Sequence, residues 1–232
     1  MVSLHDCTPD VVDLVETHGR ASLHGATVMI KLSPMLDISV IINELPNIAE
    51  IHIVAVKNEC KEVLVLLRPD YDGKITIHCV DLSPAGTRHA LSLQYAINDE
   101  SVAIPTFATT IKKYLYEPNA AIMKAGAFKL VSQRFGIDKL HVNSHLYTSD
   151  TLIPDFPGRV FEVVGSAPFS KKIKKELLKD VTEASVAVRN FPLSANELRK
   201  SLNLKESDEN FVFGTIMMGE KKVVIYCKKH RE

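Results

Sequence analysis

Lysine side chains crowd one short stretch of the sequence. Lys171, Lys172, Lys174 and Lys175 surround a single apolar residue, and Leu177 and Leu178 follow. This spacing predicts a helix over residues 170–179 with an apolar stripe inward and the ammonium groups outward. Such a face can neutralise phosphates, and its affinity for nucleic acid then falls steeply with salt. The competing interpretation is an ordinary solvated helix face.

A second candidate group follows a predicted strand over residues 184–188. Arg189 offers a guanidinium that can hold a phosphate, and Phe191 a ring that can stack on an unpaired base, with Asn190 between them. These three residues, with the four lysines, are the nucleic-acid-binding candidates. The alternative is that Phe191 belongs to the core beneath a tight turn before Pro192.

Polar residues also follow two predicted strands in the N-terminal half. Ligands in open α/β sheets bind at the carboxyl ends of strands, so these residues are candidates for a substrate site. The alternatives are a helix cap in the first group and a solvated turn in the second. The candidates are Ser33, Pro34 and Asp37 after one strand, and Lys57, Asn58 and Glu59 after the other.

Alternating helices and strands must position the N-terminal candidates. A helix is predicted to open at Thr8 and end near Gly19. A strand over 27–32, buried on both faces in a parallel sheet, leads into a helix that begins at Pro34 and ends near Leu45. Strands over 48–56 and 63–67 flank a polar turn at 57–62 and form an antiparallel hairpin. Residues 70–97 supply two further strands that extend the sheet or cover its edge.

The C-terminal half has a different pattern. An extended piece from Tyr114 stops at Pro118 and leads into one helix that ends at Gly136. Residues 150–158 are the best linker, and beyond them the order is β-α-β-α-β-β. Ser194 and Glu197 form a capping box at the start of the second helix there.

Composition restricts the class of protein. The sequence has 232 residues and no net charge. Residues 1–100 hold 7 basic and 14 acidic side chains and the remainder 21 and 14. This asymmetry indicates either an acidic partner for the second half, most commonly nucleic acid, or the solvated faces of ordinary domains. No apolar run approaches the roughly 18 residues of a membrane span, so a cytoplasmic protein is expected.

No metal site is predicted from the sequence. His141 and His145 are four residues apart, a spacing that suits a metal only on a helix and with further ligands. The four cysteines are far apart and are interpreted as buried thiols.

Several segments carry a family resemblance. HDCTPDVVDL, VMIKLSPMLDIS and EIHIVAVKNECKEVLVLL resemble the last third of the catalytic domain in bacterial class I S-adenosylmethionine-dependent methyltransferases with a THUMP-like domain. YLYEP followed by KAG is similar to the start of that family's ferredoxin-like insert. VRNFPLSANELRKSLNL and the later FGTI are similar to its THUMP-like domain.

The resemblance implies a fold and three domains. The expected fold is α/β, with a partial Rossmann-like methyltransferase sheet made of the final strands and the antiparallel hairpin. Small α+β ferredoxin-like and THUMP-like domains follow it. The expected limits are 1–98 for the sheet, 99–158 for the ferredoxin-like insert and 159–232 for the THUMP-like domain.

It also implies a function. The chain would be the C-terminal portion of a transferase that methylates RNA, either rRNA or tRNA. The family's glycine loop and Asp-Pro motif lie upstream of the matching segments, and no GxG loop follows a predicted strand. S-adenosylmethionine is therefore the cofactor expected for an intact member and not for this chain alone, which is expected to hold no catalytic residues and to be inactive.

Two other functions remain open. A non-catalytic RNA-binding or protein-interaction adaptor would use the same basic residues. A small-molecule enzyme using Lys31 or Asp37 is disfavoured, because no pair of titratable groups is visibly matched to a reaction. If the sheet is incomplete, residues 27–32 expose an apolar edge, and a homodimer formed through that edge is expected.

Overall fold

The computed structural model describes residues 3–6, 8, 10–13, 15, 27–82 and 91–230. It divides into two compact units. The first comprises the described residues up to Val102 together with Asn119–Ala127, and the second comprises Ala103–Pro118 and the chain from Phe128 onward. Each unit is therefore built from two separate segments of the chain, because Asn119–Ala127 return to the first unit.

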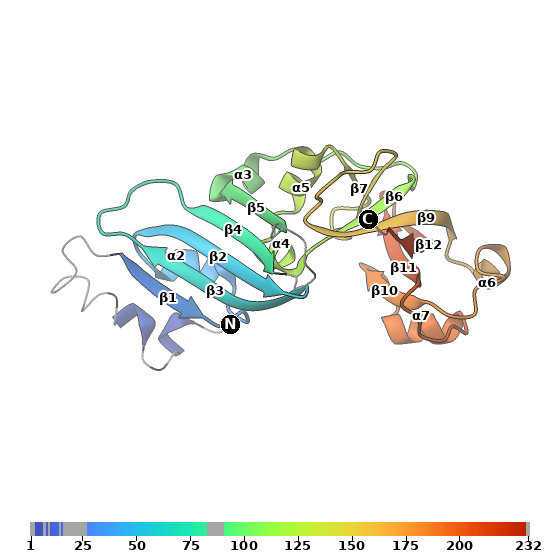
Figure 1. Cartoon of the computed structure of the whole chain (residues 1–232), viewed down its shortest axis with the longest axis horizontal. Coiled ribbons are helices and arrows are strands. Elements are labelled where there is room, and N and C mark those ends of the chain that lie inside the picture. Colours follow the sequence, from blue (N-terminus) through green and yellow to red (C-terminus); the bar gives the residue numbers. More distant parts are fainter. Residues whose placement is uncertain are drawn as a thin grey trace. The chain divides into compact units, whose positions relative to one another are not determined.

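A five-stranded sheet forms the first unit (Figure 1). Its strand order is β1-β3-β2-β4-β5, with β3 antiparallel to β1 and β2, β4 parallel to β2, and β5 antiparallel to β4. The strands β1, β2 and β4 therefore all run in one direction. The strands are β1 (Val28–Leu32), β2 (Ile48–Val56), β3 (Glu59–Leu67), β4 (Thr76–Leu82) and β5 (Leu91–Ala96).

One face of this sheet is buried in the hydrophobic core of the unit. Ile51, Ile53 and Val63 are fully buried there, as period-2 alternation requires. The helix α4 (Ala120–Ala125) packs on β2, β3 and β4, and the Tyr95 hydroxyl donates to the Ala125 carbonyl at 3.3 Å. The side chains on the opposite face alternate with the core residues and are mostly only half-buried.

Other helical elements of this unit include η1 (Leu4–Asp6), α2 (Ile38–Glu44) and α3 (Ile97–Val102). Of the helix predicted to start at Thr8, residues 11–13 and 15 are helical, and its predicted end at Gly19 lies outside the described residues.

The predicted start of α2 was wrong. Pro34 lies in a turn closed by the Leu36 amide donating to the Ser33 carbonyl at 3.2 Å. The helix begins at Ile38 instead, because the Asp37 carboxylate accepts from the Ser39 amide at 2.8 Å and caps it. Asp and Ser are both strong N-caps, so composition alone did not choose between them.

The hairpin was predicted correctly, but its turn is shorter than expected. Lys57 and Asn58 alone form it, with φ of 54° and 59°, and β3 starts at Glu59. Two consecutive positive φ angles are typical of the type I′ turn that suits a twisted hairpin. Glu59 and Lys61 are solvent-facing strand residues and not part of a loop.

The predicted environment of β1 was also wrong. β1 pairs antiparallel with β3, and no second partner strand lies beside it among the described residues. Its Met29 side chain is 63% exposed, so one face is uncovered. A short apolar run cannot by itself distinguish a central parallel strand from an edge strand.

A seven-stranded sheet forms the second unit. Its order is β10-β11-β12-β9-β6-β8-β7, and the long strand β9 pairs with β12 on one side and with β6 on the other. The strands are β6 (Tyr114–Pro118), β7 (Asp138–Lys139), β8 (Tyr147–Ser149), β9 (Gly158–Pro168), β10 (Ser185–Arg189), β11 (Asn210–Met217) and β12 (Lys221–Lys229).

This sheet curls so that distant strands approach. The Met218 amide donates to the Leu140 carbonyl at 3.0 Å, and the Ser144 hydroxyl donates to the Ile216 carbonyl at 2.7 Å. The segment after β7 therefore contacts the end of β11, four strands away in the sheet order from β8. Buried Phe161 and Phe213 fill the space enclosed by the curl.

The helices of the second unit are α5 (Phe128–Phe135), α6 (Ile173–Glu176) and α7 (Ala195–Ser201). The β-α-β-α-β-β order after the linker and the capping box of Ser194 and Glu197 are confirmed. The single helix predicted to end at Gly136 is instead two, α4 and α5, because Gly126 has a φ of 73° and ends α4. The predicted helix over 170–179 is one turn.

No described helix combines the length and apolar character needed to cross a membrane.

Candidate functional site

The predicted substrate-side residues after β1 lie at the carboxyl end of this strand, and two of them hydrogen-bond to nearby residues. The Ser33 hydroxyl accepts from the Met35 amide at 3.2 Å. Asp37 accepts from both the amide and the hydroxyl of Ser39, and these bonds lower the pKa of its carboxyl group. Pro34 shapes the turn between them. The polar atoms therefore hold the turn and the helix start.

The candidates after β2 lie at the same end of the sheet as those after β1, because β1 and β2 run in the same direction. The Asn58 side-chain oxygen accepts from the Ala120 amide at 2.8 Å and so fixes the start of α4. Lys57 shares the hairpin turn, and the Glu59 carboxylate pairs with Lys61 at 2.7 Å. A substrate role for all six residues stays a prediction.

The four clustered lysines do not all have the same environment. Lys171, Lys172 and Lys175 are exposed. The Lys174 ammonium instead donates to the Val181 carbonyl, and partial burial lowers its pKa. Three of the four ammonium groups are therefore available to an anionic partner.

Arg189 takes part in a charged group around a buried carboxylate. Glu117 is 3% exposed, and its two oxygens are held by different guanidinium groups. Arg189 lies 2.5 Å from one oxygen, while Arg159 donates through Nε and Nη2 to the other. The Arg189 and Arg159 side chains are 36% and 37% exposed, so both arginines are only partly buried.

The other two residues of that turn are also anchored. The side-chain Nδ2 of Asn190 lies 3.1 Å from Nδ1 of His141, and Nε2 of the same imidazole lies 3.2 Å from Oε1 of Glu220. Phe191 packs edge-on against Phe169 within the core under α7. Its ring thus has the packing role that was the alternative to base stacking.

A buried lysine lies close to this turn. The Lys139 ammonium donates to the carbonyls of His141 and Val142 at 2.8 and 2.6 Å and lies 3.3 Å from Nδ1 of His145. The His145 ring stacks on Phe128 with centroids 3.5 Å apart. Burial, then the positive charges of Lys139 and Arg189, lower the pKa of His145 to about 4. His145 is therefore neutral at neutral pH.

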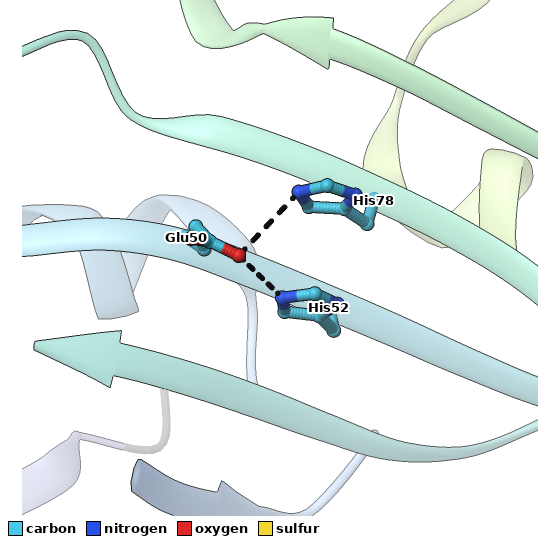
Figure 2. A group of neighbouring side chains, drawn as sticks. All are labelled: Glu50, His52 and His78. Atoms are coloured by element: carbon cyan, nitrogen blue, oxygen red, sulfur yellow. Dashed lines mark hydrogen bonds and ion pairs between the residues drawn. The ribbon is translucent and has the colours of Figure 1, made fainter. Parts of the chain in front are cut away.

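A separate cluster lies on the half-exposed face of the first unit's sheet (Figure 2). His52 of β2 is the register partner of His78 of β4, and the two rings stack with centroids 4.3 Å apart and planes within 2°. Oε2 of Glu50 lies 3.0 Å from Nε2 of His52 and 3.7 Å from Nε2 of His78. Both imidazoles therefore direct the same ring nitrogen toward one carboxylate oxygen.

The second oxygen of that carboxylate has its own partner. Oε1 of Glu50 accepts from Nη2 of Arg68 at 2.6 Å. Burial and the neighbouring imidazole of His52 lower the pKa of His78, with Glu50 acting in the opposite direction. The neutral imidazole, which is the form that ligates metals, is thereby favoured at His78.

Sequence reasoning missed this cluster because its residues come from two strands. A weak signal was present: IHIV in β2 and IHCV in β4 each place a histidine between apolar residues, at the outward position of the alternation. The strand pairing that brings the two histidines together could not be read from those motifs.

Two family models match the second half of the chain. Residues 114–157 match a ferredoxin-like domain and residues 158–229 match a THUMP domain-like family. In the structure the two matched segments share one sheet, joined by the pairing of β6 with β9. These matches define the class: a chain with a THUMP-like domain attached to a ferredoxin-like one.

A solved structure resembles the whole chain. It is described as a putative methyltransferase from Porphyromonas gingivalis W83, with 35% identity and a TM-score of 0.90 over all of this chain. The chain spans 57% of the length of that protein. No curated protein matches. The resemblance is thus confirmed: the chain is a relative of a methyltransferase-like protein and carries a THUMP-like domain.

Proposed function

We propose that this chain is the C-terminal, substrate-side portion of an S-adenosylmethionine-dependent RNA methyltransferase. The observation that carries the proposal is the full-length similarity to the P. gingivalis protein, at 35% identity and a TM-score of 0.90. The THUMP-like match over residues 158–229 supports RNA as the substrate class.

The first unit supports the proposal through its strand arrangement. An antiparallel hairpin, β2 and β3, follows β1 and α2 along the chain, in the order expected near the end of a Rossmann-like methyltransferase sheet. The sheet continues beyond the hairpin through β4 and β5. Because β1 and β2 run in the same direction, the six substrate-side candidates lie at one end of the sheet, the carboxyl ends of its strands, where ligands of such sheets bind.

The described residues at the carboxyl end of β1 do not suit S-adenosylmethionine. A nucleotide cradle needs free backbone amides in a glycine-rich turn, whereas the Met35 and Ser39 amides are taken by the side chains of Ser33 and Asp37. We therefore propose that these 232 residues neither bind the cofactor nor transfer a methyl group alone. Calorimetry with S-adenosylmethionine tests this, and binding in the micromolar range would overturn it.

The second unit supplies the proposed RNA-binding groups. Lys171, Lys172 and Lys175 are exposed, and the Arg189 side chain is 36% exposed while Glu117 and the Val188 carbonyl hold its guanidinium. A guanidinium held in place loses less entropy on binding phosphate than a free one. Asn190 is exposed next to Arg189, whereas Phe191 contributes by packing.

An RNA titration followed by fluorescence anisotropy at two salt concentrations tests RNA binding. The combined Lys171, Lys172 and Lys175→Ala variant should bind more weakly, with a log-log salt slope reduced by about 0.7 for each phosphate that its lysines no longer neutralise. The matched control is the combined Lys221, Lys228 and Lys229→Ala variant, which removes equal charge from exposed lysines of β12. Equal weakening in both variants would indicate unspecific attraction.

The second candidate function is a non-catalytic RNA-binding or protein-interaction adaptor. The local hydrogen bonds of Ser33, Asp37 and Asn58 favour it, because these side chains hold a turn and the starts of α2 and α4. It predicts RNA binding without any change in RNA affinity when a cofactor-binding partner is added. No RNA binding by the unmodified chain would leave only the protein-interaction form.

A further inference from the structure

We propose that Glu50, His52 and His78 form a binding site for a zinc-type divalent metal ion. The site lies on the half-exposed face of the five-stranded sheet and is independent of the proposed RNA methyltransferase function. Sequence reasoning predicted no metal site in this chain. The structural pairing of β2 with β4 is what assembles the three ligands.

The strand geometry sets the ligands on one face. Glu50 and His52 are two residues apart on β2, so their side chains project from the same side of the sheet. His78 lies opposite His52 on the neighbouring parallel strand. Figure 2 shows the three side chains converging from these two strands.

The distances suit tetrahedral coordination. Metal–ligand bonds of about 2.0–2.1 Å at tetrahedral angles put neighbouring ligand atoms roughly 3.3 Å apart. The two observed distances from Oε2 of Glu50, 3.0 Å and 3.7 Å, bracket that value. One ligand atom from each of the three residues lies within 4.8 Å of the others. The two rings are parallel, so their in-plane lone pairs do not yet converge, and the rings must rotate relative to each other before both can ligate one ion.

The ligand chemistry selects the class of ion. Two imidazoles and one carboxylate suit zinc and its first-row neighbours, not magnesium or calcium, which prefer oxygen ligands. Three protein ligands leave a fourth position for water or an exogenous ligand. The side chains are 22–28% exposed, so that position is reachable from solvent.

Arg68 is an outer-sphere partner of the site. Its bond to Oε1 of Glu50 turns the other oxygen toward the imidazoles, as carboxylate ligands are commonly oriented in metal sites. Its positive charge opposes the metal, but the arginine side chain is 49% exposed and solvent screens the repulsion.

Zinc titration of the chelator-treated full chain by calorimetry is the experiment. We expect one zinc ion per chain, and a tetrahedral spectrum when Co²⁺ is the probe. His52→Gln and His78→Gln should each weaken zinc binding at least about tenfold. Zinc should raise the melting temperature of the unmodified chain and not that of either variant.

The matched control is His5→Ala. It removes the other described group with metal-ligand potential, in which His5 lies near Asp10 and Asp13 and is 55% exposed. Zinc binding should be unchanged in this variant. The proposal is overturned if the unmodified chain binds no zinc, if both glutamine variants melt as folded proteins and retain full affinity, or if His5→Ala abolishes binding.

Discussion

Gly158 shows how one residue fixes the junction between two matched domain segments. It starts β9 opposite Pro118, and a Cβ there would lie 2.1 Å from the Glu117 carbonyl oxygen and 2.9 Å from the Pro118 Cα. Both are backbone atoms, which cannot move aside without displacing β6. The close pairing of β6 with β9 therefore requires glycine at this position.

Gly158→Ala should destabilise the second unit by about 1–3 kcal/mol, the usual range for overpacking. Denaturant unfolding measures the free energy. Gly73→Ala is the control, because a Cβ there would meet only the end of the Tyr71 side chain, which can rotate away. Equal losses in the two variants would contradict the argument from backbone contact.

His145 should make stability depend on pH. Its pKa in the folded chain, about 4, lies below that of an unfolded histidine, so as pH falls below the unfolded value the unfolded state binds a proton that the folded state refuses. Stability is therefore lost between about pH 6.5 and pH 4. Above that range His145 contributes no pH dependence.

Comparing unfolding curves of the unmodified chain and His145→Asn over that range isolates the effect. Asparagine tolerates the φ of 52° at this position and does not titrate there. We expect the difference in stability between the two proteins to change with pH in favour of the variant as acid is added. A constant difference would show that folding does not lower the pKa of His145.

Sequence reasoning succeeded at the residue scale where chemistry is local. The capping box of Ser194 and Glu197 depends only on spacing and was predicted correctly. The pairs of Glu117 with Arg159 and Arg189 depend on a sheet that brings β6, β9 and β10 together. No local pattern carries that information, so Arg189 was interpreted without its buried partner.

At the scale of elements, α7 offers a direct test of capping. Ser194→Ala removes the side chain that accepts from the Glu197 amide at 3.3 Å and should cost about 1 kcal/mol of stability. Ser201→Ala, at the other end of the same helix, is the control and should cost less. Thermal unfolding measures both, and a larger cost at Ser201 would contradict the capping account.

The edge strand β1 supports a prediction about association. Its outer edge has no partner among the described strands, and Met29 beside it is 63% exposed. We propose that copies of the chain pair through this edge, so sedimentation should show concentration-dependent dimers. Met29→Lys adds a second charge next to Lys31 and should shift the chain to monomer without changing its fold. A monomer at all concentrations would refute edge pairing.

Element types were predicted better than element limits. The hairpin and the β-α-β-α-β-β order follow from strong periodicity. The start of α2 and the break between α4 and α5 depend on which of several suitable residues forms the cap, and in the structure these are Asp37 and Gly126. The predicted domain limits at 98 and 158 stay predictions.

At the scale of the whole molecule, α4 is the unusual element. It lies within the segment that matches the ferredoxin-like domain, yet it packs on the sheet of the first unit. Its Ile122 is fully buried there, and Asn58 fixes its first turn. The stability of the first sheet therefore depends on residues from the middle of the chain.

Ile122→Ala should destabilise the first unit by about 2–5 kcal/mol, the range for large-to-small core changes. Hydrogen exchange read by mass spectrometry should show faster exchange in β2–β4 and little change in β9–β12. Ile225→Ala in β12, also a fully buried isoleucine and part of the second unit's core, is the matched control and should show the reverse. Faster exchange of both sheets in both variants would mean that the units unfold together.

The position of α4 limits how this gene can recombine. A crossover at the start of the ferredoxin-like segment would exchange α4 together with that segment. The five-stranded sheet of the first unit would then be packed against an α4 from a different protein. Only partners that already match the Ile122 and Asn58 contacts would survive such an exchange. The two modules are therefore expected to be inherited as a pair.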